Sequence, residues 1–319
     1  MADVQWEQRT VAVPDLTIAC YEAGRGALVL VLHGGPGHDH RFMRTLAAPL
    51  TQHFQCVLYD QRGTGHSRLA HTDPFTLHID RFVSDIEALR VHFGTAQLTL
   101  VGWSWGATLA LMYSLAHPSH VERLAMISPG PIPFEMLEVY QANLLRPLTI
   151  SEREQVSDLQ IRSATALQTG DIAQYNALFQ RRMEIMFRVW FYDPNLAQQY
   201  LATFVQAINP YRIAQMEPYI YGSLGEFSGW QNMDQLTMPT LIMYGYQDFE
   251  PITQAYTLRE WMPQAELRWL TSAGTGRGLS NRCSSTQSSK HFCVVTCNAG
   301  EQLAGNDALL RGKNSRFRP

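Results

Sequence analysis

The sequence predicts an α/β fold: a mostly parallel, doubly wound sheet that carries an inserted helical region. Short, continuous apolar runs alternate with helical stretches up to about residue 127. This alternation is typical of a sheet whose helices cover both faces. A long helical stretch then interrupts the pattern, and strand-like segments resume near residue 238. We therefore expect the helical block to lie between two parts of one sheet.

The first part of the core is expected to contain four buried strands. Two of them are "ALVLVLHGG" and "CVLYD", which are continuous apolar runs that end at Gly35 and Asp60. "RFVSDIEALRVHF" repeats its apolar residues at helical spacing. "LTLVG" predicts a third strand, and the helix that follows it stops before Pro118. "VERLAMIS" predicts the fourth strand.

The inserted region is expected to be helical throughout. Ser151 and Glu154 fit a capping box, and Gly170 fits the end of that helix. "DIAQYNALFQRRMEIMFRVWFYD" predicts a second helix. The region is rich in Met and aromatic residues, which suits both internal packing and a lid over an apolar substrate pocket. The predicted organisation is a core in two parts (1–130 and 235–273), a helical cap (131–234) and a tail (274–319).

The bulk properties exclude several classes of protein. A length of 319 residues suits one α/β domain with an insertion. The net charge of −3, with no basic stripe among aromatic residues, argues against a nucleic-acid partner. No apolar run is long enough to span a membrane, and the N-terminus lacks a secretory signal. The odd number of cysteines (five) predicts reduced thiols in a cytoplasmic protein.

The segment "GWSWG" provides a candidate nucleophile. It places Ser104 between flanking glycines, directly after a strand and before a helix. A serine on such a sharp turn exposes its Oγ, and the N-terminus of the following helix favours developing negative charge. We predict that Ser104 is a nucleophile; the alternative is an ordinary turn between a strand and a helix.

Glycines after the first strand provide candidate oxyanion donors. "LHGGPG" can direct backbone N–H groups at an oxyanion, so the predicted donors are the amides of Gly35 and Trp105. His33 is expected to brace this loop. In "YDQRGTGHS", Asp60 and Arg62 are expected to fix neighbouring loops.

A candidate acid follows the strand in "LIMYGYQDFEP". Asp248 lies just beyond this strand, where a carboxylate can orient an imidazole. The chain order Ser, Asp, His is the order found in hydrolases of this kind. Glu250 is the alternative acid.

The motifs "HGGPG", "DQRGTGHS", "GWSWG" and "GYQDFEP", in this order, resemble the proline iminopeptidase group of the α/β-hydrolase fold over about residues 10–273. The resemblance implies that Ser104 forms an acyl-enzyme and that N-terminal residues, preferably proline, are released from small peptides. It also implies cap glutamates that hold the substrate's free amine; Glu226 and Glu184 are the candidates. The expected partner is a short peptide or other small molecule, with no cofactor and no metal.

The resemblance also requires a histidine directly after the last strand, and "SAG" is followed here by Thr275. The remaining chain contains a single histidine, His291, in unrelated surroundings. A dinucleotide loop is excluded because Leu279 stands where the third glycine belongs. We interpret the change as a reading-frame shift near Gly274, because codons that encode the following residues can encode "HWPWPIEPM" one base earlier. The alternative is a natural, divergent tail.

Two expectations follow from this interpretation. Residues 274–319 should lack stable packing, because their polar, Gly- and Ser-rich composition buries little apolar area. Activity should be severely reduced unless His291 replaces the missing base.

Two other functions are compatible with the same motifs. One is a carboxylesterase that acts on small esters, and the other is a non-catalytic ligand-binding relative. Dehalogenases and epoxide hydrolases of this fold carry Asp at the nucleophile position, so Ser104 argues against them. The sequence leaves the oligomeric state open.

Overall fold

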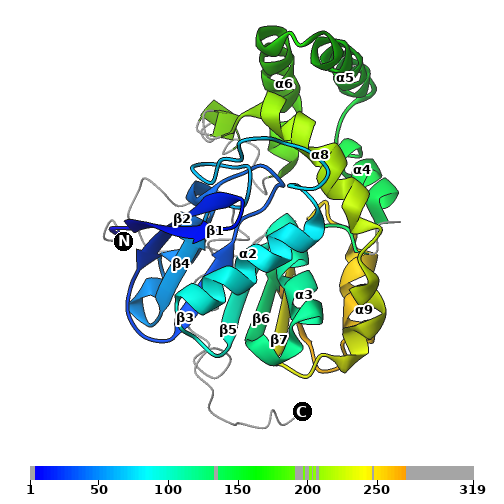
Figure 1. The fold of residues 1–319 in the computed structure, drawn as a ribbon. Helices are drawn as coiled ribbons and strands as arrows, with labels where there is room; N and C mark the ends of the chain where they lie inside the picture. The colour runs from blue at the N-terminus through cyan, green and yellow to red at the C-terminus, as the bar shows by residue number, and fades with distance from the viewer. Residues whose placement is uncertain are drawn as a thin grey trace.

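The protein is built around one eight-stranded sheet (Figure 1). The computed structural model describes residues 4–132, 136–190, 197, 201–202, 204–205, 208–245 and 248–270. The strands are β1 (Glu7–Val13), β2 (Leu16–Ala23), β3 (Leu28–Leu32), β4 (Gln55–Tyr59), β5 (Leu98–Trp103), β6 (Val121–Ile127), β7 (Thr240–Gly245) and β8 (Glu266–Leu270). Their spatial order is β1-β2-β4-β3-β5-β6-β7-β8.

From β4 to β8 the sheet is parallel, which confirms the predicted fold class. The antiparallel strands β1 and β2 form a hairpin at one edge, with Val13 opposite Leu16, and β2 pairs antiparallel with β4. The sequence analysis did not anticipate this hairpin. Most of β1 is exposed at the sheet edge, so it lacks the continuous apolar run that marks a buried strand.

Helices cover both faces of the sheet. One face packs against α2 (Ile79–His92), α3 (Trp105–Ala116) and α9 (Ile252–Trp261), and the other against the short α1 (Arg44–Ala47). Successive residues of β3 alternate between the two cores: Leu30 belongs to the first and Val31 to the second. Burial on both sides explains why these strands are apolar at every position.

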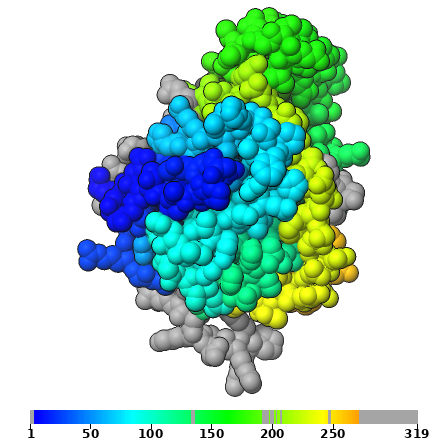
Figure 2. All heavy atoms as spheres, viewed as in Figure 1, coloured from blue at the N-terminus to red at the C-terminus, as the bar shows by residue number. Residues whose placement is uncertain are grey.

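A group of helices lies between β6 and β7 in the chain and over one end of the sheet (Figures 1 and 2). The helices are α4 (Leu137–Leu145), α5 (Ile150–Thr169), α6 (Ile172–Met186) and α8 (Pro210–Leu224), with the 3₁₀ segment η5 (Phe187–Trp190). The 3₁₀ segment η6 (Ser228–Gln235) also precedes β7, but it packs against α3. We call the region between β6 and β7 the cap. Shorter 3₁₀ segments occur in the core at His40–Met43, Leu50–Gln52 and Pro118–His120.

The start of α5 differs from the prediction. The capping box is formed by Thr149 and Glu152, because the hydroxyl of Thr149 accepts from the N–H of Glu152 and the Glu152 carboxylate accepts from the N–H of Thr149. The assignment of Ser151 and Glu154 is therefore wrong by two residues. Gly170 ends the helix in the left-handed conformation, as predicted (φ 72°).

Buried charges fix the loops at the carboxyl ends of the strands. The side chain of Arg62 is 1% exposed and donates to the carboxylates of Asp85 and Asp15 and to the carbonyl of Thr76. Asp60 accepts from the backbone N–H groups of His40 and His66. These contacts confirm the predicted structural roles of Arg62 and Asp60.

Cys20 and Cys56, the cysteines in the described segments, are buried and free, and burial raises the pKa of each to about 12. Among the helices that the structure describes, none is long and apolar enough to cross a membrane. The tail from residue 274, with Thr275 and His291, lies outside the described residues.

Candidate active site

Ser104 occupies the turn between β5 and α3 in a conformation that is unusual for a serine. Its backbone has φ 52° and ψ −124°, and it immediately precedes the first residue of α3. The flanking glycines permit this turn, because a Cβ at Gly102 would overlap the backbone of Gly106, and a Cβ at Gly106 would overlap the backbone of Leu32. The strained backbone holds the serine at the N-terminal end of a helix, where partial positive charge is concentrated.

Two adjoining cavities meet at Ser104. The smaller, of about 50 Å³, is lined by Ser104, Gly35 and Trp105. The larger, of about 290 Å³, also contains Ser104 and Gly35 and extends among cap residues. The structure therefore brings the predicted nucleophile and both predicted oxyanion donors to one place.

His33 is engaged in holding the loop that carries Gly35. Its Nε2 accepts from the backbone N–H of Gln61 at 3.0 Å, so its Nδ1 carries the proton and donates to the carbonyl of Gly34 at 2.8 Å. Burial lowers the pKa of His33. Both ring nitrogens are thus used, and His33 braces the loop as expected.

Gln61 connects this loop to the turn that carries Ser104, a contact that the sequence analysis missed. Its Nε2 donates to the carbonyl of His33 at 2.7 Å, and its Oε1 accepts from the indole Nε1 of Trp105 at 2.8 Å. One buried amide therefore ties together the two segments that carry Gly35 and Trp105. The only sequence signal was the position of Gln61 next to Asp60, directly after a strand.

Asp248 lies beyond β7, two strands away from β5 in the sheet. Its carboxylate accepts from the hydroxyl of Ser128, which follows β6, and from the N–H of Gly245 at 3.4 Å. Burial raises the pKa of Asp248, while these hydrogen bonds lower it. The segment where the resemblance places the histidine lies outside the described residues.

The two predicted cap glutamates do not line either cavity at Ser104. The side chain of Glu226 is 72% exposed, with its carboxylate 3.3 Å from Nε2 of His78. Glu184 is exposed on α6 and accepts from Gln180. Both carboxylates are therefore directed toward solvent and neighbouring surface side chains.

The cavities contain two other glutamates. Glu217 of α8 lines the larger cavity, and burial raises its pKa to about 7. Glu250 lines the smaller cavity, is 2% exposed, and its Oε2 has no hydrogen-bond partner in the described structure. Burial and the charge of Asp248 raise the pKa of Glu250. A signal for Glu217 existed: it is the one acidic residue of α8.

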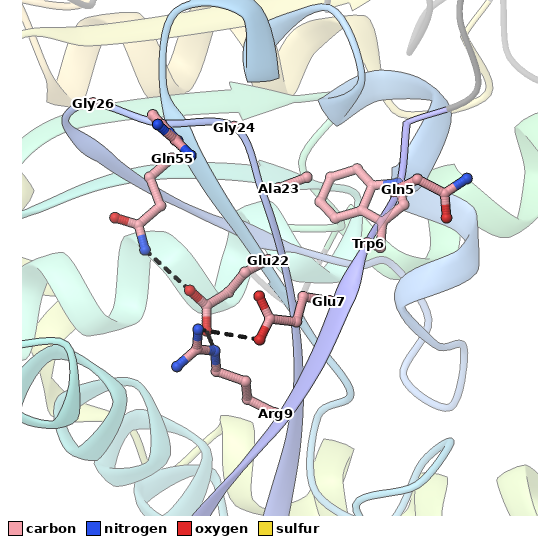
Figure 3. A pocket seen from close by; sticks show the side chains of 10 residues that line it. Gln5, Trp6, Glu7, Arg9, Glu22, Ala23, Gly24, Gly26 and Gln55 are labelled. Atoms are coloured by element: carbon pink, nitrogen blue, oxygen red, sulfur yellow. Dashed lines mark hydrogen bonds and ion pairs between the residues drawn. The ribbon is translucent and has the colours of Figure 1, made fainter.

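A third cavity, of about 590 Å³, lies at the N-terminal hairpin and is not lined by Ser104 (Figure 3). Three of its four charged side chains are paired with one another: Arg9 contacts Glu7 at 3.2 Å and Glu22 at 3.0 Å, and Gln55 donates to Glu22 at 3.0 Å. The fourth, Arg25, is exposed. We assign no role to this cavity.

In the part of the chain that the structure describes, two groups of side chains have ligand atoms close enough together to consider a metal. In the first, Asp39, His40 and Asp60 are buried, and the Asp60 carboxylate already accepts from Nδ1 of His40 at 2.7 Å. The second group consists of Glu87, His117 and His120. Its Glu87 carboxylate accepts from Arg90 and Tyr113. These carboxylates are satisfied by protein donors.

Comparison with known proteins agrees with this geometry. The family model described as "alpha/beta hydrolase fold" matches residues 27–276. A proline iminopeptidase from Heyndrickxia coagulans is 28% identical over 240 residues, which cover 74% of this chain and 80% of the relative. One from Xylella fastidiosa is 39% identical over a shorter stretch of 106 residues, 32% of each chain.

Solved structures show the same fold. A serine hydrolase from Cycloclasticus zankles has a TM-score of 0.64 at 19% identity, with 95% of each chain covered. A proline iminopeptidase from Mycobacterium smegmatis has a TM-score of 0.57 at 23% identity, covering 82% of this chain and 89% of its own. The chain therefore belongs to the α/β hydrolase fold family, and within that family it is similar to the proline iminopeptidases.

Proposed function

We propose that this protein is a serine hydrolase whose site is built to release an N-terminal residue, preferably proline, from short peptides. The observation that supports this most strongly is the shared cavity at Ser104. It combines a serine on a strained turn, the backbone of Gly35, and the half-buried carboxylate of Glu217. A hydrolase of simple esters has no need of the carboxylate.

The proposed reaction begins when the Oγ of Ser104 attacks the carbonyl carbon of the first residue and loses its proton to a base. The backbone N–H groups of Gly35 and Trp105 stabilise the oxyanion. Cleavage of the C–N bond releases the rest of the peptide as an amine, which takes the proton, and leaves an acyl-enzyme on Ser104. Water then attacks the acyl carbon and releases the free amino acid.

Recognition of the amine is proposed to depend on Glu217. An ammonium group beside this carboxylate gains a charge-assisted hydrogen bond in a partly dry site. Tyr140 and Tyr221 line both cavities beside Ser104 and provide apolar surface that suits a pyrrolidine ring. Glu250 is proposed as a second carboxyl that faces the same site. These two residues replace Glu184 and Glu226 as our candidates.

The missing base is proposed to limit the reaction. Thr275 stands where the resemblance requires a histidine. Loss of one member of such a triad commonly lowers the rate by about 10⁴–10⁶. We therefore expect substrate binding with weak turnover in this chain, and strong turnover after the alternative reading frame is restored.

A carboxylesterase remains the second candidate, because Phe179, Met183 and Phe204 give the larger cavity an extensive apolar wall. A comparison of proline anilide with a short aryl ester, on the chain with the alternative reading frame restored, separates the two. Glu217→Gln should reduce anilide turnover and spare the ester, whereas Glu184→Gln, on the exposed face of α6, should affect neither. Equal activity of Glu217→Gln and the parent toward the anilide would refute amine recognition by Glu217.

A further inference from the structure

A separate cavity of about 300 Å³ lies where the start of α8 meets two glycine-rich core loops. Gly37 contributes from the loop of Gly35, and Gly63 and Gly65 contribute from the loop after β4. Ile208 and Ile213 line both this cavity and the larger cavity at Ser104. The two cavities therefore adjoin. We call this one the arginine cavity, after Arg41, Arg68 and Arg212, which line it.

The arginine cavity carries an excess of positive charge. The guanidinium of Arg41 is paired with Asp39 through hydrogen bonds of 2.9 and 3.0 Å, so these charges offset each other. Within the described ranges, the side chains of Arg68 and Arg212 have no carboxylate partner. Two guanidinium groups thus face the same space without a counter-charge.

The positive charge of the cavity disfavours the charged form of Arg212. This residue is half-buried, and burial together with repulsion from Arg68 lowers its pKa. Arg212 also lies in the first turn of α8, at the positive end of the helix. The side chain of Asn209 accepts from the backbone N–H of Arg212 at 3.1 Å and so fixes this turn. An anion bound here would relieve the repulsion.

Helix α8 also relates this cavity to the proposed amine site. Arg212 and Glu217 are five residues apart on one helix, which corresponds to about 7.5 Å along its axis and about 140° around it. Their side chains therefore leave different faces of α8. Glu217 lines the cavity at Ser104 and Arg212 lines the adjoining one. One helix thus presents a carboxylate to the first cavity and a guanidinium to the second, so the two charged ends of a short peptide would each meet an opposite charge.

We propose that the arginine cavity binds the C-terminal carboxylate of a di- or tripeptide whose N-terminal amine lies beside Glu217. This inference rests on the proposed function. It narrows the substrate class to very short peptides with a free carboxylate, and it assigns Arg212, assisted by Arg68, to that end of the substrate.

Calorimetric binding of prolyl-glycine and prolyl-glycine amide at pH 8 tests the proposal. The full-length chain carries Ser104→Ala so that neither ligand is consumed. We expect the free acid to bind about tenfold more tightly than the amide, as one charge-assisted contact would give. Arg212→Gln should lower the affinity for the acid to that for the amide, without changing the amide. Arg68→Gln, at an exposed position, should also lower the affinity for the acid and leave that for the amide unchanged.

Two controls make the outcomes distinct. Arg25→Gln removes the same charge at the remote hairpin cavity and should change nothing. Glu217→Gln should weaken both ligands equally. Equal binding of acid and amide by the parent, or equal weakening of both by Arg212→Gln in a protein with a native circular-dichroism spectrum, would overturn the arginine assignment and leave the proposed function intact. Failure of both ligands to bind would overturn the proposed function, and this inference with it.

Discussion

The side-chain amide of Gln61 accepts a hydrogen bond from the indole of Trp105 while it donates to the carbonyl of His33. The turn that carries Ser104 and the loop that carries Gly35 are therefore linked by one buried side chain. An amide is suited to this position because it offers a donor and an acceptor on the same rigid group. The link makes the relative position of Gly35 and Trp105 depend on a residue that contacts neither substrate nor nucleophile in our proposed mechanism.

Replacing Gln61 with Leu should lower both stability and turnover. The carbonyl of His33 and the indole N–H of Trp105 would lose their partners in a buried environment, at a cost of about 1–3 kcal/mol for each unsatisfied group. Urea unfolding measures the stability loss. Gln97→Leu removes an exposed amide that donates to the carbonyl of Ser119, and its change should be within about 0.5 kcal/mol. A Gln61→Leu protein as stable as the parent would contradict the proposed link.

Arg62→Leu should be strongly destabilising. The buried carboxylate of Asp85 would lose its bidentate partner, and breaking a buried pair in this way typically costs about 3–5 kcal/mol. The matched comparison is Arg162→Leu, which removes an exposed pair with Asp158 and should cost no more than about 0.5 kcal/mol. The thermal unfolding midpoint of Arg62→Leu should be much lower than that of Arg162→Leu. Similar midpoints would argue against the structural role of Arg62.

Gly106→Ala should disrupt the nucleophile turn. The added Cβ would overlap the backbone carbonyls of Leu32 and His33, which cannot move without displacing the central strand β3. Gly222→Ala, in the last turn of α8, meets open space and should stabilise the helix by up to about 1 kcal/mol. The two substitutions add the same methyl group, so opposite shifts in unfolding midpoint would separate local crowding from the general effect of replacing glycine.

Stability should depend on pH through Glu217. Because its pKa is raised to about 7 in the folded protein, the folded state binds more protons than the unfolded state between about pH 4.5 and 7. Stability from this group is present at low pH and is lost as the pH rises through 7. Glu217→Gln should therefore be more stable than the parent at pH 8, by about 1–2 kcal/mol for a half-buried group, and equal to it below pH 4.5.

Urea unfolding of the parent and Glu217→Gln at pH 8 and pH 4 measures this difference. Glu184→Gln serves as the control, because it makes the same substitution at an exposed position of the cap. A stability gain of Glu217→Gln that is the same at both pH values would show that ionisation of Glu217 is not its source. Binding of an amine should have the opposite pH dependence and strengthen as Glu217 ionises.

The sequence predicts well those parts of the structure in which one physical requirement, such as burial on both faces, determines the residue pattern. The strands that contain Leu30 and Leu241 are buried on both faces, so their apolar runs are continuous and easily recognised. Ser104 was predictable because the neighbouring backbone excludes every residue but glycine at positions 102 and 106. The edge strand β1 of the hairpin was missed because most of its residues are exposed, so it carries no such pattern.

The orientation of the cap side chains is hard to predict from the sequence because it depends on how the helices pack. Glu184, Glu217 and Glu226 are chemically identical, and only the tertiary arrangement directs Glu217 into the cavity at Ser104. The same is true of Gln61, whose partners His33 and Trp105 follow two different strands, β3 and β5. Even the start of α5 depended on a local choice, since Thr149 and Ser151 offer similar hydroxyls and the chain uses the earlier one.

In the function that we propose, the position of α8 separates substrate recognition from the chemical step. Arg212 and Glu217 belong to the insertion between β6 and β7, whereas Ser104, Gly35 and Trp105 belong to segments fixed by the sheet. Exchange of a few residues on this one helix can therefore alter ligand preference while the chemical apparatus stays intact. Such a division gives evolution, or a protein engineer, a route to new selectivity that does not disturb the nucleophile.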